Sequence, residues 1–370
     1  MQSVILGFTK QGNPVSLDFT HNGPSRSTMI TGTSGSGKSV LIRAIISRGI
    51  EKGLKFIILE TKNDTHGDFL PYYSKIDPYI LQSSDPDTIA NLIGANRNDL
   101  SILIDVCREG DTWEQIREKL RREMNNTKRH PLERKDAKMV EHYLGKILDE
   151  MKSLKDIRFD LQLKPQVAVM DLRGLSEEMQ RLIASSTASW ILNFETNTIL
   201  IVDEYHKQGH NKRLEDYAAE GRSKGNFLIA CDQNVTKILP DMRNNFQVWI
   251  FGRANDINKA KRVADQTIGL SLKPKDAMQL KTGEFLVNDY NEGTTERIFA
   301  WGDWYSQEEA RKFAIGEIRL KDLPKASEIL LEEPRIDMRA SVLMAEIPQE
   351  IRDDWEDVYN EAEKVLKKYV

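Results

Sequence analysis

STMITGTSGSGKSVLIRAII, residues 27–46, joins an apolar segment, a glycine-rich loop and a second apolar segment with helical spacing. The central part, Gly32–Ser39, matches GxxxxGK followed by Ser or Thr at every fixed position. It follows a predicted strand, Ser27–Gly32, and opens a predicted helix that runs from Lys38 to about Ile50. This context distinguishes a phosphate-binding loop from a chance run of glycine and serine, so the stretch predicts an α/β fold.

The composition of the loop suits the binding of a nucleoside triphosphate. Glycines permit positive φ and a close approach of the backbone, so that successive N–H groups and the helix N-terminus surround phosphate oxygens. Lys38 is expected to reach the β- and γ-phosphates, and Ser39 to hold Mg²⁺. We therefore expect ATP and Mg²⁺ as ligands. The predicted nucleotide-binding residues are Gly32, Thr33, Ser34, Gly35, Ser36, Gly37, Lys38, Ser39 and Val40.

Outward from the loop, predicted strands alternate with predicted helices, which implies a mostly parallel, doubly wound α/β sheet. A hairpin precedes the loop, and a second hairpin lies within 283–301. A short helix is predicted at Asp87–Ile93, and another helix after the capping residue Ser176. The remaining predicted strands are Lys55–Glu60, Leu100–Val106, Gln166–Leu172, Thr198–Glu204, Phe227–Cys231 and Val248–Gly252.

Two segments differ from this pattern. Apolar residues at helical spacing and many charges predict a helical insertion at 107–163, with two helices separated by Asn125–Pro131. The tail, 302–370, has Pro-broken stretches followed by an amphipathic helix. The predicted organisation is an N-terminal hairpin over 1–26, an ATPase core formed by 27–106 and 164–301, the insertion and the helical tail.

Acids at strand ends supply the candidate catalytic groups. Three predicted strands end on an acid, at Asp105, Asp171 and Asp203, but only the last is followed by a second acid, Glu204. This pair predicts Asp203 as a magnesium ligand and Glu204 as the base that polarises the attacking water. The alternative interpretation is that such an acid only caps the helix or strand that follows it, and we prefer this interpretation for Asp105. Two other acids remain candidates for the surroundings of the metal: Glu60 and Asp68.

Several later stretches together resemble the HerA–FtsK superfamily of ring-forming P-loop ATPases, and its HerA branch most. The resemblance covers about Val4 to Trp301 apart from the insertion, and it implies a RecA-like core. The stretches that carry it are QVAVMDLRGLSEEMQRLIASSTASWIL (166–192), EGRSKGNFLIACDQ (220–233), MRNNFQVWIFGRANDINKAKRVA (242–264) and LKTGEFLV (280–287).

The resemblance implies three further roles. Gln233 matches the polar sensor that contacts the γ-phosphate or the attacking water. Arg222 matches an arginine that acts on the neighbouring subunit's nucleotide, and Arg253 matches a second basic position, the reserve candidate for that role. The chain departs from the pattern at Asp232, where the family has a small residue before the glutamine.

The net charge of −4 indicates that any contact with nucleic acid comes from local patches. One candidate follows the acid pair directly and contains Lys207, Lys212 and Arg213. The other is Arg117–Lys138 in the insertion, which has nine Lys or Arg against four Asp or Glu. Both could neutralise DNA phosphates, and a solvated charged face is the alternative for both.

The resemblance implies a homo-hexameric motor that translocates double-stranded DNA with a nuclease, portal or channel partner. A nucleotide-switched assembly ATPase of a secretion or defence complex, which moves no DNA, is the alternative. A small-molecule kinase is disfavoured because no acceptor site or lid is recognisable. Apolar runs are too short to span a bilayer and the two cysteines have no metal spacing, so no membrane insertion and a cytoplasmic location are expected.

Overall fold

The computed structural model of the 370-residue chain divides into two units, 1–318 and 319–370. The second unit, and with it nearly all of the predicted tail, lies outside the residues that the structure describes. These residues are 2–20, 26–61, 74–81, 83, 85–93, 97–153, 167–209, 211–233, 245–269, 271–300, Lys312 and Glu317, with the side chains of 74, 75 and 91–99 left aside.

One mixed sheet organises the first unit, and eleven of its strands lie in the described residues, in the order β2-β1-β11-β10-β9-β3-β8-β7-β4-β6-β5. The strands are β1 (Ser3–Phe8), β2 (Pro14–Asp18), β3 (Thr28–Thr31), β4 (Lys55–Glu60), β5 (Ser74–Ile76), β6 (Val167–Asp171), β7 (Thr198–Val202), β8 (Phe227–Asp232), β9 (Val248–Phe251), β10 (Glu284–Asp289) and β11 (Thr294–Ala300).

The strands from β9 to β5 pair in parallel, whereas the pairs that join β9, β10, β11, β1 and β2 are antiparallel. This arrangement confirms the mostly parallel sheet and both predicted hairpins. The strand β3, which enters the glycine-rich loop, lies between β8 and β9. The carboxyl ends of β3, β8 and β7 therefore meet at one edge of the sheet, where α/β proteins usually bind ligands.

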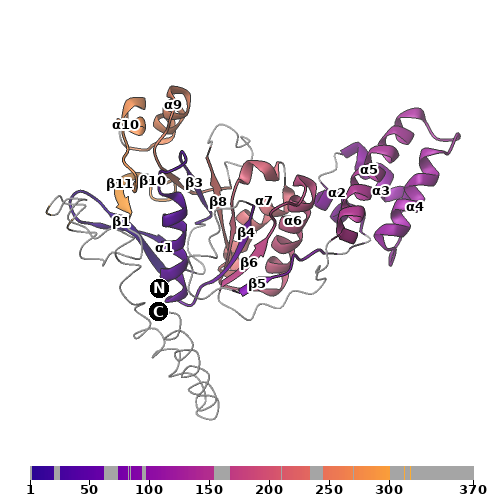
Figure 1. Cartoon of the computed structure of the whole chain (residues 1–370), viewed down its shortest axis with the longest axis horizontal. Helices are drawn as coiled ribbons and strands as arrows, with labels where there is room; N and C mark the ends of the chain where they lie inside the picture. The colour runs from indigo at the N-terminus through magenta and orange to yellow at the C-terminus, as the bar shows by residue number, and fades with distance from the viewer. Residues whose placement is uncertain are drawn as a thin grey trace, which may run out of the picture. The chain divides into compact units, whose positions relative to one another are not determined.

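Helices cover both faces of the sheet (Figure 1). Along β4, Phe56 and Ile58 join the apolar cluster that contains α1, while Ile57 and Leu59 join the cluster that contains α6 and α7. This alternation follows from the two-residue period of a strand. The helices are α1 (Lys38–Ile50), α2 (Pro86–Ile93), α3 (Arg97–Val106), α4 (Trp113–Met124), α5 (Pro131–Ser153), α6 (Glu177–Phe194), α7 (Lys212–Glu220), α9 (Ile257–Gln266), α10 (Pro274–Met278) and the short 3-10 helices η2 (Tyr205–Gln208) and η3 (Gly221–Lys224). No helix in the described part of the chain is long and apolar enough to cross a membrane.

The predicted strand at Leu100–Val106 is wrong, because this segment belongs to the helix α3. Ile102, Leu103 and Val106 are buried, whereas Ile104 is 56% exposed. Burial at positions i, i+1 and i+4 is a helical pattern, which a short apolar run does not distinguish from a strand by composition. Asp105 consequently ends no strand, and its carboxylate lies 2.6 Å from Nη1 of Arg129.

The predicted helices of the insertion are present as α4 and α5. Thr112 caps α4 through a reciprocal pair of hydrogen bonds with Gln115. The apolar residues Trp113, Ile116 and Leu120 are buried in the same cluster as residues of α3 and α5. The helical segment that contains α4 and α5 therefore also includes α3, so it begins before residue 107, the predicted start of the insertion.

Candidate nucleotide-hydrolysis site

The glycine-rich loop has a backbone conformation that requires glycine. Gly32, Gly35 and Gly37 have φ of 154°, 73° and 100°. A Cβ on Gly32 would lie 2.8 Å from Oγ of Ser36 and 3.0 Å from Cα of Gly252, closer than van der Waals contact allows. The loop thus packs tightly against the end of β9, with the Thr33 amide donating to the Arg253 carbonyl at 2.9 Å.

The electrostatics of the loop favour an anion. Helix α1 begins directly after Gly37, without a side-chain cap and without an acidic residue in its first turn. Its N-terminal amides therefore carry an uncompensated partial positive charge. Nζ of Lys38 adds a full charge and donates to the carbonyls of Gly32 at 2.6 Å and Thr33 at 3.0 Å. The N-terminal amides of α1 and the ammonium group of Lys38 are therefore suited to bind the anionic oxygens of a triphosphate.

Ser39 and Asp203 also fit Mg²⁺. Ser39 lies in the first turn of α1 and Asp203 directly follows β7, and both are half-buried. A hydroxyl and a carboxylate are suitable ligands, since Mg²⁺ usually takes one or two protein oxygens beside substrate phosphates and waters. When bound, the ion would neutralise charge on the phosphate oxygens.

Glu204 stands in an unusual conformation beside Asp203. It has φ of 50° and ψ of 49°, a left-handed conformation that glutamate rarely adopts. Its amide donates to Oδ1 of Asp203 at 2.9 Å, and the residue is only 8% exposed. Residues in such strained conformations cluster at functional sites.

Gln233 lies next to Glu204. Its Nε2 donates to Oε1 of Glu204 at 3.1 Å, although the two residues are 29 positions apart in the chain. The contact arises because β7 and β8 are parallel neighbours and both residues follow the strand ends. The structure thus brings together the predicted base and the predicted sensor.

The sequence did not reveal the partner of Asp232. This residue ends β8, and its Oδ2 accepts hydrogen bonds at 2.8 Å from the amide of His206 and at 2.8 Å from its ring Nδ1. The only signal was the departure at Asp232 from the pattern of similar proteins.

The two candidate arginines lie at opposite ends of the strands, Arg222 near the amino ends and Arg253 near the carboxyl ends. Arg222 is exposed in η3, which bonds to Asn197 just before β7 and so lies at the amino edge. The six residues of β8 span about 20 Å, so Arg222 is far from its own chain's loop. Arg253, in contrast, lines a small cavity beside that loop together with Gln233 and Lys259, a residue that the sequence pattern did not single out.

The predicted DNA-contacting residues after the acid pair differ in their environment. Lys212 and Arg213 share Asp216, at 2.7 Å and 3.9 Å. The hydrogen bond that Lys212 donates to Asp216 raises the pKa of Lys212. Lys207 lies in η2 and has no ion pair within the described residues, while His210 lies outside them.

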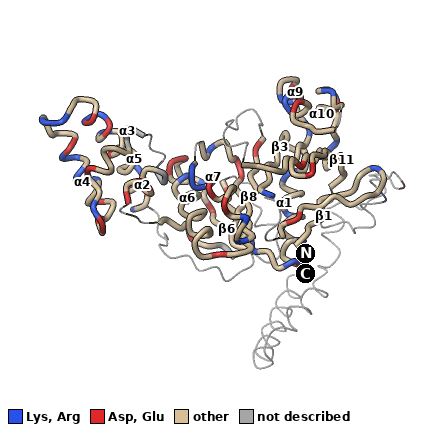
Figure 2. Tube along the Cα trace, turned by 180° about the vertical axis from the view of Figure 1, so that it is seen from behind, with Lys and Arg blue, Asp and Glu red and all other residues tan. Residues whose placement is uncertain are grey.

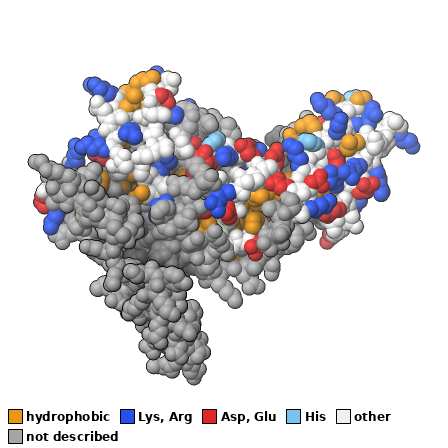
Figure 3. Space-filling model, viewed as in Figure 1, with side chains coloured by type: hydrophobic (Ala, Val, Ile, Leu, Met, Phe, Trp, Pro, Cys, Tyr) orange, Lys and Arg blue, Asp and Glu red, His pale blue; other side chains and the backbone are white. Residues whose placement is uncertain are grey.

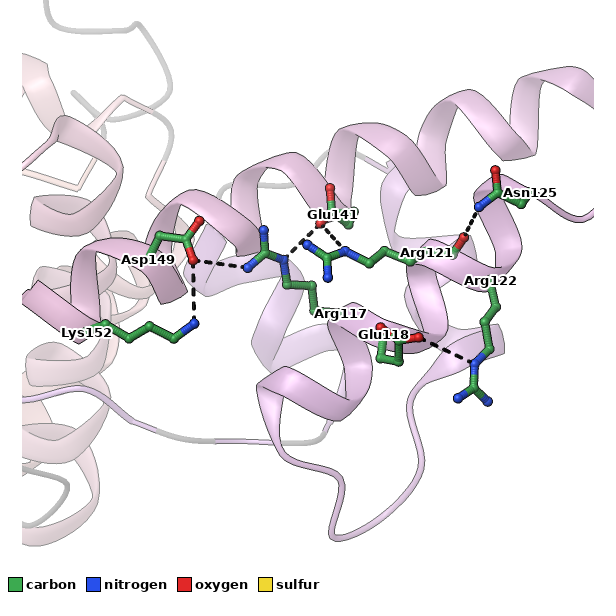
Figure 4. Close-up of polar contacts among 8 residues, drawn as sticks. All are labelled: Arg117, Glu118, Arg121, Arg122, Asn125, Glu141, Asp149 and Lys152. Carbon is green, nitrogen blue, oxygen red and sulfur yellow. Dashed lines mark hydrogen bonds and ion pairs between the residues drawn. The ribbon is translucent and has the colours of Figure 1, made fainter.

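Several basic side chains of the insertion form ion pairs with acidic side chains of the same insertion. Arg117 and Arg121 of α4 both donate to Oε1 of Glu141 in α5 at 2.9 Å, and Arg117 also reaches Asp149 at 3.3 Å (Figure 4). Burial raises the pKa of Glu141, but the two guanidinium groups lower it more, so that the net shift is downward. We name this group of Arg117, Arg121 and Glu141 the α4–α5 clasp.

The surface of the insertion has charges of both signs. Basic and acidic positions follow one another along α4 (Figure 2), and both kinds of side chain mix over this part of the molecule (Figure 3). Arg129 lies within 2.6 Å of Asp105 and also pairs with Glu123. Because acidic side chains lie among these cations and pair with several of them, the insertion is a weaker candidate for contacts with DNA phosphates.

The other candidate acids are placed as follows. Glu60 ends β4 and is buried, at 5% exposure. Asp171 ends β6, and its Oδ1 accepts from Nε of Arg173 at 2.7 Å. Asp68 lies outside the described residues. Of the three acids predicted at strand ends, only Asp203 is followed by a second carboxylate that contacts a neighbouring strand end.

Comparison with known proteins identifies relatives of this chain. A family model described as "Helicase HerA, central domain" matches residues 5–191, about half of the chain. This match ends before Asp203, so it does not cover the acid pair, Arg222 or Gln233. Among curated proteins no sequence matches significantly.

Solved structures resemble the chain over most of its length. VirB4 of Thermoanaerobacter pseudethanolicus has a TM-score of 0.59 at 15% identity, covering 81% of this chain and 96% of its own. The bacterial conjugative coupling protein TrwB has a TM-score of 0.60 at 14% identity, covering 80% and 88%. The TrwB structure with ADP and Mg²⁺ scores 0.58 at 13% identity, covering 77% and 88%. At these identities the likeness establishes a shared RecA-like fold.

Proposed function

This chain belongs to the family of the HerA helicase central domain, a HerA–FtsK type of P-loop ATPase, and on this premise we propose that it hydrolyses ATP to translocate double-stranded DNA as a ring of identical subunits. One observation supports the hydrolysis most strongly. The phosphate loop, the acid pair and Gln233 lie at one edge of the sheet, and Gln233 donates to Glu204 at 3.1 Å.

Each of these residues has a role in the proposed reaction. Lys38 and the N-terminal amides of α1 hold the β- and γ-phosphates and offset charge that develops in the transition state. Glu204 accepts a proton from the water that attacks the γ-phosphorus, while the bond from this phosphorus to the bridging oxygen breaks and ADP leaves. Gln233 keeps the carboxylate and the water aligned. Ser39 and Asp203 would hold Mg²⁺, which would neutralise charge on the phosphate oxygens.

The position of Arg222 supports a ring. It lies exposed at the amino edge, about one strand length from its own loop, so it cannot assist hydrolysis in its own chain. In a ring of six subunits it would approach the nucleotide of the neighbouring subunit, and hydrolysis would then depend on assembly. Arg253, beside its own loop, would instead act on the nucleotide of its own chain.

DNA as the moved partner is supported by the family and by the segment after the acid pair. Helix η2 follows Glu204 directly and carries Lys207, and α7 begins with Lys212 and Arg213. Contacts from these cations to phosphates would be independent of sequence and sensitive to salt. TrwB is a conjugative coupling protein, and a transfer or packaging channel is the partner that we propose here.

The test combines ATP hydrolysis with a translocation assay. The full chain is given ATP and duplex DNA that carries a third-strand oligonucleotide, and Lys38→Ala serves as the inactive control. We expect duplex DNA to stimulate hydrolysis and the third strand to be displaced. Hydrolysis without stimulation or displacement would refute the motor and favour an assembly ATPase, whereas no hydrolysis at all would refute the site.

A further inference from the structure

Asp232 is a buried carboxylate next to the predicted sensor. Its side chain has 0% exposure. A charge in such a position is strongly destabilising unless hydrogen bonds compensate for the lost hydration. The residue is therefore expected to have a specific structural partner, and its location at the end of β8 restricts that partner to the strand ends around the site.

His206 provides two of the compensating bonds. Its amide and its ring Nδ1 both lie 2.8 Å from Oδ2 of Asp232. Because a carboxylate only accepts hydrogen bonds, Nδ1 is the ring nitrogen that carries the proton. The two bonds join η2, which follows β7, to the end of β8. We call this contact between His206 and Asp232 the strand-end clasp.

The strand-end clasp brackets Glu204. His206 follows Glu204 by two positions, and its Nδ1 lies 3.7 Å from Oε2 of Glu204. Gln233 follows Asp232 directly and donates to the other oxygen, Oε1. The carbonyl of Glu204 in turn accepts from the amide of Lys207 at 2.8 Å, which fixes the start of η2.

We propose that His206 is a positioning residue for Glu204 and acts through Asp232. The strand-end clasp holds the left-handed turn at Glu204 against the strand that carries Gln233, so that base and sensor keep one relative geometry. This role rests on the proposed ATP hydrolysis, and it adds that the strand-end clasp keeps Glu204 aligned for that reaction.

A positioning role predicts a specific kinetic effect. Misplacement of a catalytic group by about 1 Å can lower the rate about 100-fold. His206→Ala and Asp232→Ala should each lower kcat about 10- to 100-fold, while KM for ATP stays within about threefold, because the phosphate loop itself is unchanged. The effects of the two substitutions on kcat should not multiply, since each one removes the bond between Nδ1 of His206 and Oδ2 of Asp232.

The experiment uses the full chain with ATP, and it measures kcat, KM, binding of a fluorescent ATP analogue and thermal unfolding. His206→Asn should recover most of the activity, since its side-chain amide donates from nearly the position of Nδ1. The double variant His206→Ala with Asp232→Ala also removes the buried carboxylate that has lost its bond from the imidazole ring, so it keeps the test valid if His206→Ala does not fold. His142→Ala, an exposed histidine on α5, is the matched control.

The outcomes separate this role from a purely structural one. Wild-type kcat in His206→Ala and in the double variant would overturn the proposal. A parallel loss of kcat, ATP binding and thermal stability, without recovery in His206→Asn, would also overturn it, because the clasp would then only stabilise the fold. Absence of turnover in the wild-type chain would overturn the proposed function itself, and the positioning role with it.

Discussion

Replacement of Glu204 by glutamine tests the assignment of the base with little structural change. The side chain keeps its shape and loses its proton acceptor. Oε1 of Glu204 accepts a hydrogen bond from Gln233 at 3.1 Å, and the carboxamide oxygen of the variant can accept the same bond. Because the residue is only 8% exposed, retention of shape and of this bond should preserve the fold around it.

The expected loss follows from the role of the carboxylate. General base catalysis contributes about 10²- to 10⁴-fold to the rate, which corresponds to roughly 3–5.5 kcal/mol in the activation free energy. Glu204 is not part of the phosphate loop, so ATP affinity should stay within about threefold of the wild type. The variant should therefore bind ATP and hydrolyse it very slowly.

Single-turnover hydrolysis with protein in excess over ATP measures the chemical step, and a fluorescent ATP analogue measures binding. Glu118→Gln, the same substitution at an exposed position of α4, is the control and should match the wild type. Turnover of Glu204→Gln within about threefold of the wild type would refute our assignment of the base. The buried Glu60 at the end of β4 would then be the next candidate.

Three further predictions concern the interface, the loop and the insertion. Arg222→Ala subunits and Glu204→Gln subunits should each be inactive alone but recover activity when mixed, and no recovery at any ratio would argue against an arginine that acts between subunits. Gly32→Ala should abolish ATP binding, measured by equilibrium titration, because its Cβ would lie 3.0 Å from a neighbouring backbone Cα; wild-type affinity would contradict the loop geometry. Glu141→Gln should destabilise α4 and α5 by about 1.5–3 kcal/mol in hydrogen exchange, against less than about 1 kcal/mol for Glu118→Gln. Because the pKa of Glu141 lies below its usual 4.5 in the folded state, this stabilisation is present above pH 4.5 and should be lost as the pH falls below it; a difference independent of pH would contradict the α4–α5 clasp.

Much of the core could be predicted from the sequence because its signals are local. A glycine-rich loop that joins a strand to a helix and ends in Gly-Lys-Ser is typical of phosphate binding. The uninterrupted apolar run of β7 likewise matches a strand with all five residues buried. The place of Gln233 at the site was implied only by the family resemblance, and its contact with Glu204 became visible only in the structure, where β7 and β8 are parallel neighbours. Their roles in catalysis stay predictions.

Other features depend on contacts that no local pattern encodes. Leu100–Val106 was assigned to a strand because a short apolar run fits either element, and only packing against α5 selects the helix. The bond between His206 and Asp232 joins residues 26 positions apart and depends on the left-handed turn at Glu204. The charge count of the insertion overstated its free cations, because ion pairs such as those of Glu141 form only in the folded state.

The most direct test of the proposed hydrolysis site is ATP turnover by the purified full chain and by Lys38→Ala, each with and without duplex DNA. Lys38 supplies the cation of the glycine-rich loop and belongs to neither apolar cluster, so its replacement is expected to leave the sheet and its core unchanged. We predict turnover in the wild type that duplex DNA increases, and none above background in the variant under either condition. Equal turnover in the two proteins would contradict the claim that the edge formed by this loop, the acid pair and Gln233 is the site of hydrolysis.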